Sequence, residues 1–310
     1  MIKCLITGGA GFIGSNLVSR LVKEGMKIVV LDNLSTGKID NLKEVQNKIE
    51  FIKGDICNYD DVKKSVKECD YIFHLAALPF VTKSIEDPIG SNQVNVNGTL
   101  NLLKCASEQK VKKFIFTSSS AVYGDDPKCP KTEDMLCWPI SPYGVTKKAG
   151  EEYCYVFAKI FGVDTISLRY FNVFGPNQSA DSEYSGVISR FIYLFLNEKI
   201  PTIFGDGFQS RDFTYVDDIV EANLLAAKCE ETKGEVVNIA CGKSINLNQM
   251  VEIMNKIMGL NIKPIYASQR IGDIKHSLSD ISKSNKLLNY FPKVSFEEGL
   301  KRTIEWFKLS

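Results

Sequence analysis

The sequence predicts an α/β protein built on a doubly wound parallel sheet, followed by a smaller C-terminal α/β domain. Three observations carry this prediction: short apolar runs alternate with helical patterns in the first half, a glycine-rich turn joins the first run to the first helix, and the alternation weakens after about residue 164. A chain of 310 residues is long enough for one large or two small domains. The weaker alternation after about residue 164 favours a second, smaller domain in the C-terminal half.

The first run and the glycines after it predict a dinucleotide site. Residues 2–7 are mostly apolar and stop at glycines, as a buried strand does, and residues 12–22 carry apolar side chains at helical spacing. Between them, Gly8, Gly11 and Gly14 form a Gly-x-x-Gly-x-x-Gly motif. Such glycines let the backbone approach a pyrophosphate, which sits on the helix N-terminus. The order strand, glycines, helix is the context in which this motif is informative.

An acidic residue follows at the spacing that such a site requires. The run at residues 27–31 ends in Asp32 and Asn33. A carboxylate there is placed to accept hydrogen bonds from an adenosine ribose and would repel a 2′-phosphate, which favours NAD over NADP. The simpler alternative for Asp32 is a turn residue at a strand end.

The same alternation continues along the chain. Residues 49–56, 71–77 and 113–120 predict three more strands, with helical segments near 60–69 and 91–109. Ligands of such a sheet lie beyond the C-terminal strand ends, where Asp55, Ala76 and Ala77 fall. His74 lies inside an apolar strand, so we expect a structural role for it.

The bulk properties exclude several other classes of protein. A net charge of +1 gives no reason to expect nucleic acid or an anionic membrane as a partner, and no window approaches the ~20 apolar residues of a membrane span. Nine scattered cysteines without a Cys-x-x-Cys motif favour reduced thiols and a cytoplasmic location. The two histidines lack a metal-ligand pattern, so we expect no metal site.

A tyrosine and a lysine lie four residues apart, at Tyr143 and Lys147. On a helix they share one face, and an ammonium one turn away favours the phenolate. Tyr143 could then accept a proton from a substrate hydroxyl. Taken alone, the pair is more simply explained as part of an amphipathic helix. A cofactor in front of the tyrosine would decide for catalysis.

Several further motifs occur in a characteristic order. They are Thr-Gly-Gly-Ala-Gly-Phe-Ile-Gly at 7–14, Asp-Asn-Leu-Ser-Thr-Gly at 32–37, Phe-His-Leu-Ala-Ala at 73–77, Asn-Val-Asn-Gly-Thr at 95–99, Ser-Ser-Ser-Ala-Val-Tyr-Gly at 118–124 and Tyr-Gly-Val-Thr-Lys at 143–147. Over about residues 1–305 the chain resembles the extended short-chain dehydrogenase/reductase superfamily, in its nucleotide-sugar epimerase/dehydratase branch. The resemblance is closest to UDP-hexose 4-epimerases. It implies a Rossmann domain that binds NAD over residues 1–168, with later segments returning to it, and a mainly substrate-binding domain over 169–310. It also implies a catalytic Ser, Tyr and Lys.

The resemblance assigns roles to the residues of the first domain. Ser119 falls on the catalytic serine position, Ser120 is the second choice, and Ser118 would face the cofactor. Lys147 would hold the nicotinamide ribose and lower the pKa of Tyr143, and oxidised nicotinamide would act in the same direction. The expected cofactor-binding residues are Gly8, Gly11, Phe12, Ile13, Gly14, Asp32, Asn33, Ser35, Thr36, Gly37, Asp55, Ile56, Leu75, Ala76, Ala77, Asn95, Ser118, Tyr143, Lys147 and Phe171.

The resemblance also implies a UDP-sugar site in the second domain. Arg211 and Arg270 correspond to two arginines that clamp the diphosphate, a task that suits guanidinium groups. Asn172 would contact the phosphates, while Pro79, Gly186 and Ser277 would wall the sugar. The expected substrate-binding residues are Pro79, Ser119, Tyr143, Asn172, Gly186, Val187, Thr202, Ile203, Phe204, Arg211, Arg270, Asp273 and Ser277.

Three reactions share this scaffold. Dehydratases carry Asp-Glu after their catalytic Thr, where this chain has Ser120 and Ala121, and decarboxylases carry a Glu in the Ala121 region. A 4-epimerase remains, using UDP-GlcNAc/UDP-GalNAc, UDP-Glc/UDP-Gal or both, because Gly186 and Ser277 leave room for an N-acetyl group. UDP-glucuronate, with Lys83 or Arg190 near its carboxylate, stays open. So do a nucleotide-sugar dehydrogenase or reductase and an NAD-binding regulatory protein.

The resemblance further implies a homodimer. Its four-helix interface would use the helices at about 91–109 and 143–161, with Ala149, Tyr153, Val156 and Phe157 as the apolar stripe. Packing of that stripe on the sheet is an equally simple interpretation.

Overall fold

A seven-stranded parallel sheet forms the centre of the first domain. The structure is a computed structural model that describes residues 1–179, 186–230, 232–268 and 275–309. The sheet order is β11-β6-β5-β4-β1-β2-β3, and each neighbouring pair is parallel. Its strands are β1 (Lys3–Thr7), β2 (Lys27–Asp32), β3 (Ile49–Lys53), β4 (Tyr71–His74), β5 (Lys113–Ser119), β6 (Thr165–Tyr170) and β11 (Glu235–Ile239). The predicted fold class is confirmed.

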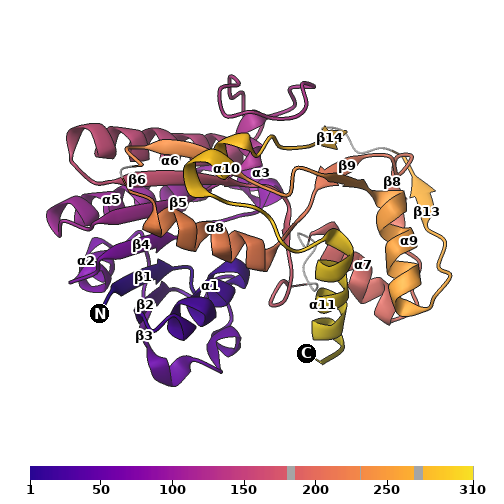
Figure 1. Ribbon diagram of the computed structural model, residues 1–310, viewed down its shortest axis with the longest axis horizontal. Helices are drawn as coiled ribbons and strands as arrows, with labels where there is room; N and C mark the ends of the chain where they lie inside the picture. Colours follow the sequence, from indigo (N-terminus) through magenta and orange to yellow (C-terminus); the bar gives the residue numbers. More distant parts are fainter. Residues whose placement is uncertain (180–185, 231, 269–274, 310) are drawn as a thin grey trace.

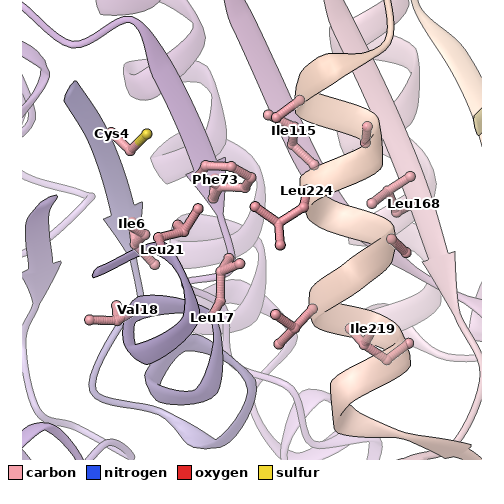
Figure 2. Packing of buried hydrophobic residues seen from close by; sticks show 14 of the residues in the cluster. Cys4, Ile6, Leu17, Val18, Leu21, Phe73, Ile115, Leu168, Ile219 and Leu224 are labelled. Carbon is pink, nitrogen blue, oxygen red and sulfur yellow. The ribbon is translucent and has the colours of Figure 1, made fainter. Parts of the chain in front are cut away.

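Helices cover both faces of this sheet (Figure 1). One face carries α1 (Phe12–Lys23) and α8 (Val216–Lys228); the other carries α2 (Tyr59–Val66), α5 (Gly98–Glu108) and α6 (Pro142–Ile160). Successive strand residues point to opposite faces. Ile6 therefore packs with Leu17 of α1 and Leu224 of α8 (Figure 2), whereas Leu5 joins the core beneath α2 and α5.

The strand order places a switch point between β1 and β4. From β1 the chain builds outward through β2 to β3, and then continues on the other side with β4 to β6. Connections diverge there, which leaves a crevice beyond the C-terminal strand ends. The glycine motif follows β1 and the three serines close β5, so both lie at this crevice.

The second lobe has its own apolar core, centred on Phe174, Phe191 and Met250. Its elements (Figure 1) are α7 (Val187–Leu196), β8 (Thr202–Phe204), β9 (Ser210–Asp212), β12 (Ser244–Asn246), α9 (Leu247–Met258), β13 (Ile265–Ala267), β14 (His276–Ser277) and α11 (Phe296–Leu309). Short strands β7 (Val173–Phe174) and β10 (Thr214–Tyr215) pair near the junction, and α10 (Ser282–Leu288) packs on β11. β11 belongs to the seven-stranded sheet and α8 packs against one face of it, so the chain crosses between the two lobes more than once. A single boundary at 168/169 stays a prediction.

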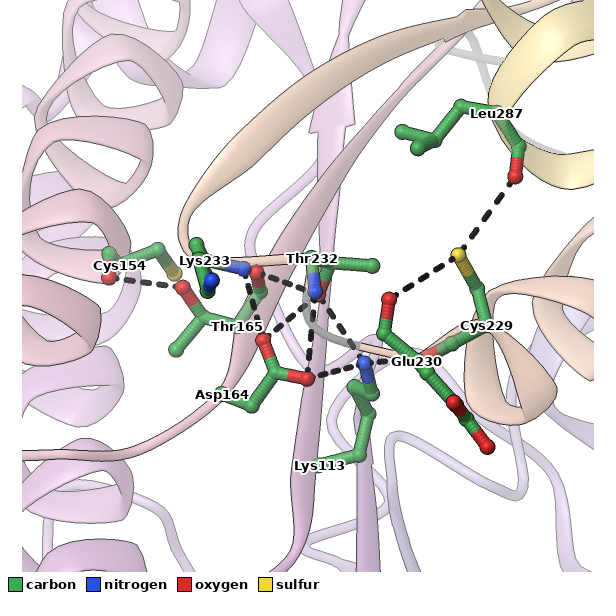
Figure 3. A network of polar contacts seen from close by, with 9 residues as sticks. All are labelled: Lys113, Cys154, Asp164, Thr165, Cys229, Glu230, Thr232, Lys233 and Leu287. Atoms are coloured by element: carbon green, nitrogen blue, oxygen red, sulfur yellow. Dashed lines mark hydrogen bonds and ion pairs between the residues drawn. The ribbon is translucent and has the colours of Figure 1, made fainter.

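A buried lysine joins strand ends on the side of the sheet away from the crevice (Figure 3). Lys113, at the start of β5, forms an ion pair with Asp164 and donates to the Cys229 carbonyl (2.6 Å) and the Thr232 hydroxyl (3.1 Å). Asp164 also accepts a backbone bond from Lys233 (2.8 Å). The network holds the beginnings of β5 and β6 and the loop before β11 together. It thereby fixes the position of β5, whose opposite end carries the serines.

The outer surface of α6 is apolar. Val145, Val156 and Ile160 are exposed there, as is Tyr153. Phe157 instead packs into the core beneath the sheet, which agrees with the alternative interpretation of the stripe for this residue. Its position on the helix faces β5 rather than solvent.

Within the described residues, no helix has the length and apolar character needed to cross a bilayer.

Candidate active site

The turn after β1 is a close-packed backbone cradle. Gly8 has φ +69°, and a Cβ on it would lie 2.8 Å from the Ala76 nitrogen. A Cβ on Gly14 would lie 2.1 Å from the Gly8 carbonyl oxygen. Glycine is therefore required at both positions. Among the described residues, no side chain caps the N-terminus of α1, so its first N–H groups face the crevice, and the cradle fits a pyrophosphate.

Asp32 closes the second side of the cradle. One carboxylate oxygen accepts the Ala10 N–H (2.9 Å) and the other the Leu34 N–H (2.8 Å). A carboxylate has about four acceptor sites, so capacity for ribose hydroxyls remains. Asp32 is both the turn residue and a wall of the cavity, which reconciles the two interpretations of it.

A cavity of about 610 Å³ lies over these strand ends. Most of the residues expected to bind the cofactor line it: Gly8, Gly11, Phe12, Ile13, Gly14, Asp32, Asn33, Ser35, Thr36, Ile56, Leu75, Ala76, Ala77, Ser118, Tyr143 and Lys147. Pro79, Ser119 and Ser120 line it too.

Three expected cofactor residues support the cavity wall instead of lining it. Gly37 packs so closely on Ala10 that a Cβ would lie 2.8 Å from the Ala10 carbonyl carbon. Asp55 accepts a bond from the Asn33 side chain (2.8 Å). Asn95 accepts the Leu78 N–H (2.8 Å). Each holds a segment that does line the cavity.

The expectation that Phe171 approaches the cofactor was wrong. Its side chain is fully buried in a cluster with Val122, Tyr123 and Ala240, and it is not among the described residues that line the cavity. Tyr170 and Asn172, on either side of it, line the cavity instead. Phe171 directly follows β6, where alternation turns its side chain away from its neighbours'.

Tyr143 and Ser119 meet at the cavity wall. Ser141 caps α6 by accepting the Gly144 N–H (3.1 Å), which places Tyr143 in the first turn of the helix. Burial raises the pKa of Tyr143, and a hydrogen bond with Ser119 opposes that rise. Ser119 also accepts the Ala121 N–H (3.1 Å). Of the three serines, Ser119 is thus the one bonded to the tyrosine.

Lys147 lies one turn further along α6. Its Nζ donates to the Thr117 carbonyl (2.8 Å) and lies 5.8 Å from the centroid of the Tyr143 ring. Burial lowers the pKa of Lys147 to about 8, with Cys154 and Glu151 opposing. Within the protein alone, burial outweighs any effect of Lys147 on Tyr143, so the expected lowering of the tyrosine's pKa is not met by the protein's own groups.

Ser118 lines the cofactor cavity, while its hydroxyl is bonded to α6. The hydroxyl donates to Glu151 (2.6 Å). The alternation of β5 sends Thr117 and Ser119 to one face and Ser118 to the other.

His74 is structural, as expected. Both ring nitrogens lie 2.8 Å from threonine hydroxyls, of Thr7 and Thr99. Burial lowers the pKa of His74 to about 3, so the ring is neutral at physiological pH. No cluster of three potential metal ligands occurs within the described residues.

A second cavity of about 520 Å³ lies in the other lobe and shares Asn172, Val173 and Gln178 with the first. Expected substrate-binding residues line it: Asn172, Gly186, Val187, Thr202, Ile203, Phe204 and Arg211. Arg190 lines it as well. Arg270 and Asp273 lie outside the described residues.

Ser277 does not line either cavity, contrary to its expected place in the sugar wall. It is buried on β14, in register with Arg211 of β9. Strand pairing with the segment that carries the arginine, and not exposure to the cavity, determines its position.

Sequence reasoning missed two residues at this site. Gln178 lines both cavities, and its buried carbonyl oxygen has no hydrogen-bond partner among the described residues. Ser84, on the short helix α3 (Val81–Glu86), accepts the Tyr143 backbone N–H (3.0 Å). Gln178 lies six residues after Asn172, an expected substrate-binding residue, whereas nothing in the sequence linked Ser84 to Tyr143.

Comparison with known proteins agrees with this geometry. Residues 4–240 match the model of the NAD dependent epimerase/dehydratase family. A putative UDP-glucose 4-epimerase of Methanocaldococcus jannaschii is 39% identical over 98% of both chains, and a UDP-glucuronate 4-epimerase of Thermodesulfobacterium geofontis is 38% identical over 98% of this chain and 95% of the other. The structure of a UDP-N-acetylglucosamine 4-epimerase from Methanobrevibacter ruminantium, in complex with UDP-N-acetylmuramic acid, superposes with a TM-score of 0.96 at 42% identity, over 99% and 98% of the two chains.

These matches cover almost the whole chain, and they confirm the expected cofactor, NAD, and the expected enzyme class, an isomerase. The glycine cradle, Asp32 and the Tyr143 wall lie within the matched residues. The chain belongs to the NAD-dependent epimerase/dehydratase family.

Proposed function

We propose that this protein interconverts UDP-hexoses that differ in configuration at C4. One observation carries the proposal: the cavity with the glycine cradle and the cavity with Arg211 share Asn172, Val173 and Gln178, and Tyr143 lines the first of them. A dinucleotide in one and a sugar nucleotide in the other would bring their reactive ends together at Tyr143.

The chain's own residues divide the proton chemistry among them. Tyr143 takes the proton of the C4 hydroxyl and later returns it. Ser119, already bonded to Tyr143, is placed to donate to the same sugar oxygen. Lys147, held by the Thr117 carbonyl, supplies positive charge that favours the phenolate. NAD, when bound, supplies reversible hydride acceptance at C4.

Epimerisation requires that the oxidised sugar present its other face before reduction. Ser120 lines the cofactor cavity, and its hydroxyl offers no carboxylic acid for removing water at C5 and C6. Without a carboxylic acid at this position, the 4-keto sugar does not lose water from C5 and C6. The hydride therefore returns to C4.

The diphosphate would lie in the second cavity. Arg211 reaches it from β9, and its Nη1 donates to the Ser210 carbonyl (3.0 Å), which orients the guanidinium. Arg270 and Asp273 belong to the proposal by resemblance alone. The Arg211→Lys variant should raise KM for the UDP-sugar about tenfold, because one point charge replaces a bidentate donor. A KM within twofold of the wild-type value would remove Arg211 from the site.

We propose UDP-GlcNAc/UDP-GalNAc as substrates, alongside or instead of UDP-Glc/UDP-Gal. Gly186 lines the second cavity, and a Cβ there would lie 3.2 Å from the Gln178 amide nitrogen. Added bulk at Gly186 would therefore press on Gln178, where the two cavities meet. Relatives of this chain are named for acetylated, neutral and acidic UDP-sugars, and the small residue favours the first.

Product analysis with all three substrate pairs tests this choice. The Gly186→Val variant should lose UDP-GlcNAc turnover while keeping more of its UDP-glucose turnover. Wild-type protein that converts UDP-glucose without converting UDP-GlcNAc would refute the substrate choice. Turnover of UDP-glucuronate alone would favour the acidic sugar, with Arg190 as the residue in the cavity that could meet its carboxylate.

We also propose a homodimer that uses the outer face of α6. Val145, Val156 and Ile160 are exposed apolar side chains on α6, and Ile89 of α4 (Pro88–Asn92) is exposed on the adjoining helix. Light scattering should give twice the monomer mass, and Val156→Asp should shift the protein toward monomer. A monomeric wild-type protein at micromolar concentration would contradict the proposal.

A further inference from the structure

A buried ion pair lies directly behind the strand that carries Ser119. Glu151 of α6 and Arg169 of β6 have side chains that are 1% and 2% exposed. Arg169 Nε donates to Glu151 Oε1 (2.7 Å) and Nη2 to Oε2 (2.8 Å), a bidentate arrangement. Neither residue is among the described residues that line the two cavities.

The same carboxylate also binds β5. Glu151 Oε1 accepts the Ser118 hydroxyl (2.6 Å), and one turn earlier on α6 Lys147 donates to the Thr117 carbonyl (2.8 Å). Tyr143, Lys147 and Glu151 are spaced at four residues along one helix face. The helix is thus fastened to two consecutive strand residues, and the next strand residue is Ser119.

The arginine end of the pair is held equally firmly. The Arg169 guanidinium carbon lies 4.7 Å from the centroid of the Tyr123 ring, and the Tyr123 hydroxyl donates to Asn238 of β11 (2.7 Å). Glu133 accepts the Asn238 N–H (2.8 Å). Glu151 is therefore anchored directly to β5 and β6 and, through Arg169 and Tyr123, to β11, while Lys148 of its own helix adds a longer ion pair (3.5 Å).

We propose that Glu151 is a positioning residue, which fixes the register of α6 on β5 so that Tyr143 meets Ser119. The inference rests on the proposed function, since it assigns a purpose to the Tyr143–Ser119 contact. A buried ion pair contributes little net stability compared with apolar packing of the same volume, so stability alone gives weak reason for this one. Its geometric effect is specific, because a carboxylate accepts bonds from both strands in one orientation.

Glu151 also influences the charge of Lys147. The titratable groups acting on Lys147 from its own helix are Glu151 and Cys154, with the Tyr143 ring nearby, and from β4 the neutral His74. Glu151 favours the ammonium against the effect of burial. Loss of its charge should move the alkaline limit of activity to lower pH.

The Ser118→Ala variant tests the proposal with least damage, because it removes one bond and keeps the ion pair. A drop in Tm of about 2–4 °C is expected for one lost buried hydrogen bond. We expect kcat to fall about tenfold or more, as misplaced catalytic groups do, with KM for the UDP-sugar nearly unchanged. Ser118→Thr, which keeps the hydroxyl, should restore kcat. The matched control is Ser65→Ala, which removes an equally buried hydroxyl bonded within α2 (2.8 Å to the Val62 carbonyl) and should lose stability without losing kcat.

A second readout does not depend on turnover. The phenolate absorbance of Tyr143, with Tyr143→Phe protein as the blank, should titrate at higher pH in Ser118→Ala, because the Ser119 bond that lowers the pKa is weakened. For the Glu151→Gln variant, once circular dichroism has shown that it is folded, the pH above which kcat declines should also be lower than in the wild-type protein. Unchanged kcat and an unchanged Tyr143 titration in Ser118→Ala would overturn the proposal. If wild-type protein converts no UDP-hexose, the proposed function fails, while the titration still decides the positioning role.

Discussion

Removal of the Tyr143 hydroxyl should abolish turnover while leaving the fold intact. The Tyr143→Phe variant keeps the ring and its packing, and the hydroxyl bond known to be lost is the one with Ser119. A positioned general base contributes about 10²–10⁴ in rate, which corresponds to about 3–5 kcal/mol of activation free energy. One hydrogen bond contributes only about 1 kcal/mol to stability, so Tm should change by a few degrees at most.

Product formation from UDP-sugar and thermal unfolding measure the two quantities separately. The matched control is Tyr153→Phe, on the same helix, whose side chain is 36% exposed and lies outside both cavities. The control should keep wild-type kcat. If Tyr143→Phe kept more than about a tenth of the wild-type kcat, well above the loss expected of a general base, Tyr143 would not be the proton acceptor.

Three further predictions concern the cradle, the lysine and the sheet. Gly14→Ala should weaken NAD binding about tenfold or more, because its Cβ would lie 2.1 Å from the Gly8 carbonyl oxygen and overpacking of this kind costs ~1–3 kcal/mol. Isothermal titration calorimetry measures the affinity for NAD. An unchanged affinity would refute the assignment of the glycine turn as the cofactor site. The value of kcat/KM should decline as pH rises through about 8. Burial lowers the pKa of Lys147 to about 8, so its ammonium form predominates only below that pH. A pH profile that stays flat up to pH 10 would contradict this prediction. Lys113→Met should destabilise the fold by about 3 kcal/mol in denaturant titrations, since it removes the buried cation that pairs with Asp164. Lys112→Met, at an exposed pair with Asp70, should cost under about 1 kcal/mol, and equal losses would refute the argument.

The strands of the first half were predictable because each is a short, mostly apolar run that ends at glycine or a polar turn. Strands β6 and β11 were harder to predict. Residues 165–170 span the expected boundary between the two domains, and β11 joins the sheet through pairing with β6, about 70 residues earlier. Pairing between strands so far apart in the chain produces no local pattern of apolar residues from which the strand could be predicted.

At the site, residues whose role depends on backbone shape were predicted well and residues whose role depends on side-chain direction were not. Gly8 and Gly14 follow from the motif, because any side chain there would collide with the loop. Phe171 was misplaced, because adjacent residues at a strand end face opposite ways and the motif does not indicate which way each side chain points. Gln178 was missed because its position depends on the meeting of two lobes.

The central claim is that one chain holds NAD through a complete cycle at C4 of a UDP-hexose. The most direct measurement is incubation of purified protein with UDP-GlcNAc and UDP-glucose, separately and without added NAD, while products are resolved and absorbance of reduced nicotinamide is followed. The account predicts the C4 epimer, with no net accumulation of reduced cofactor. Accumulating reduced cofactor with an oxidised sugar would indicate a dehydrogenase, and neither product nor reduced cofactor from any UDP-hexose would contradict the claim.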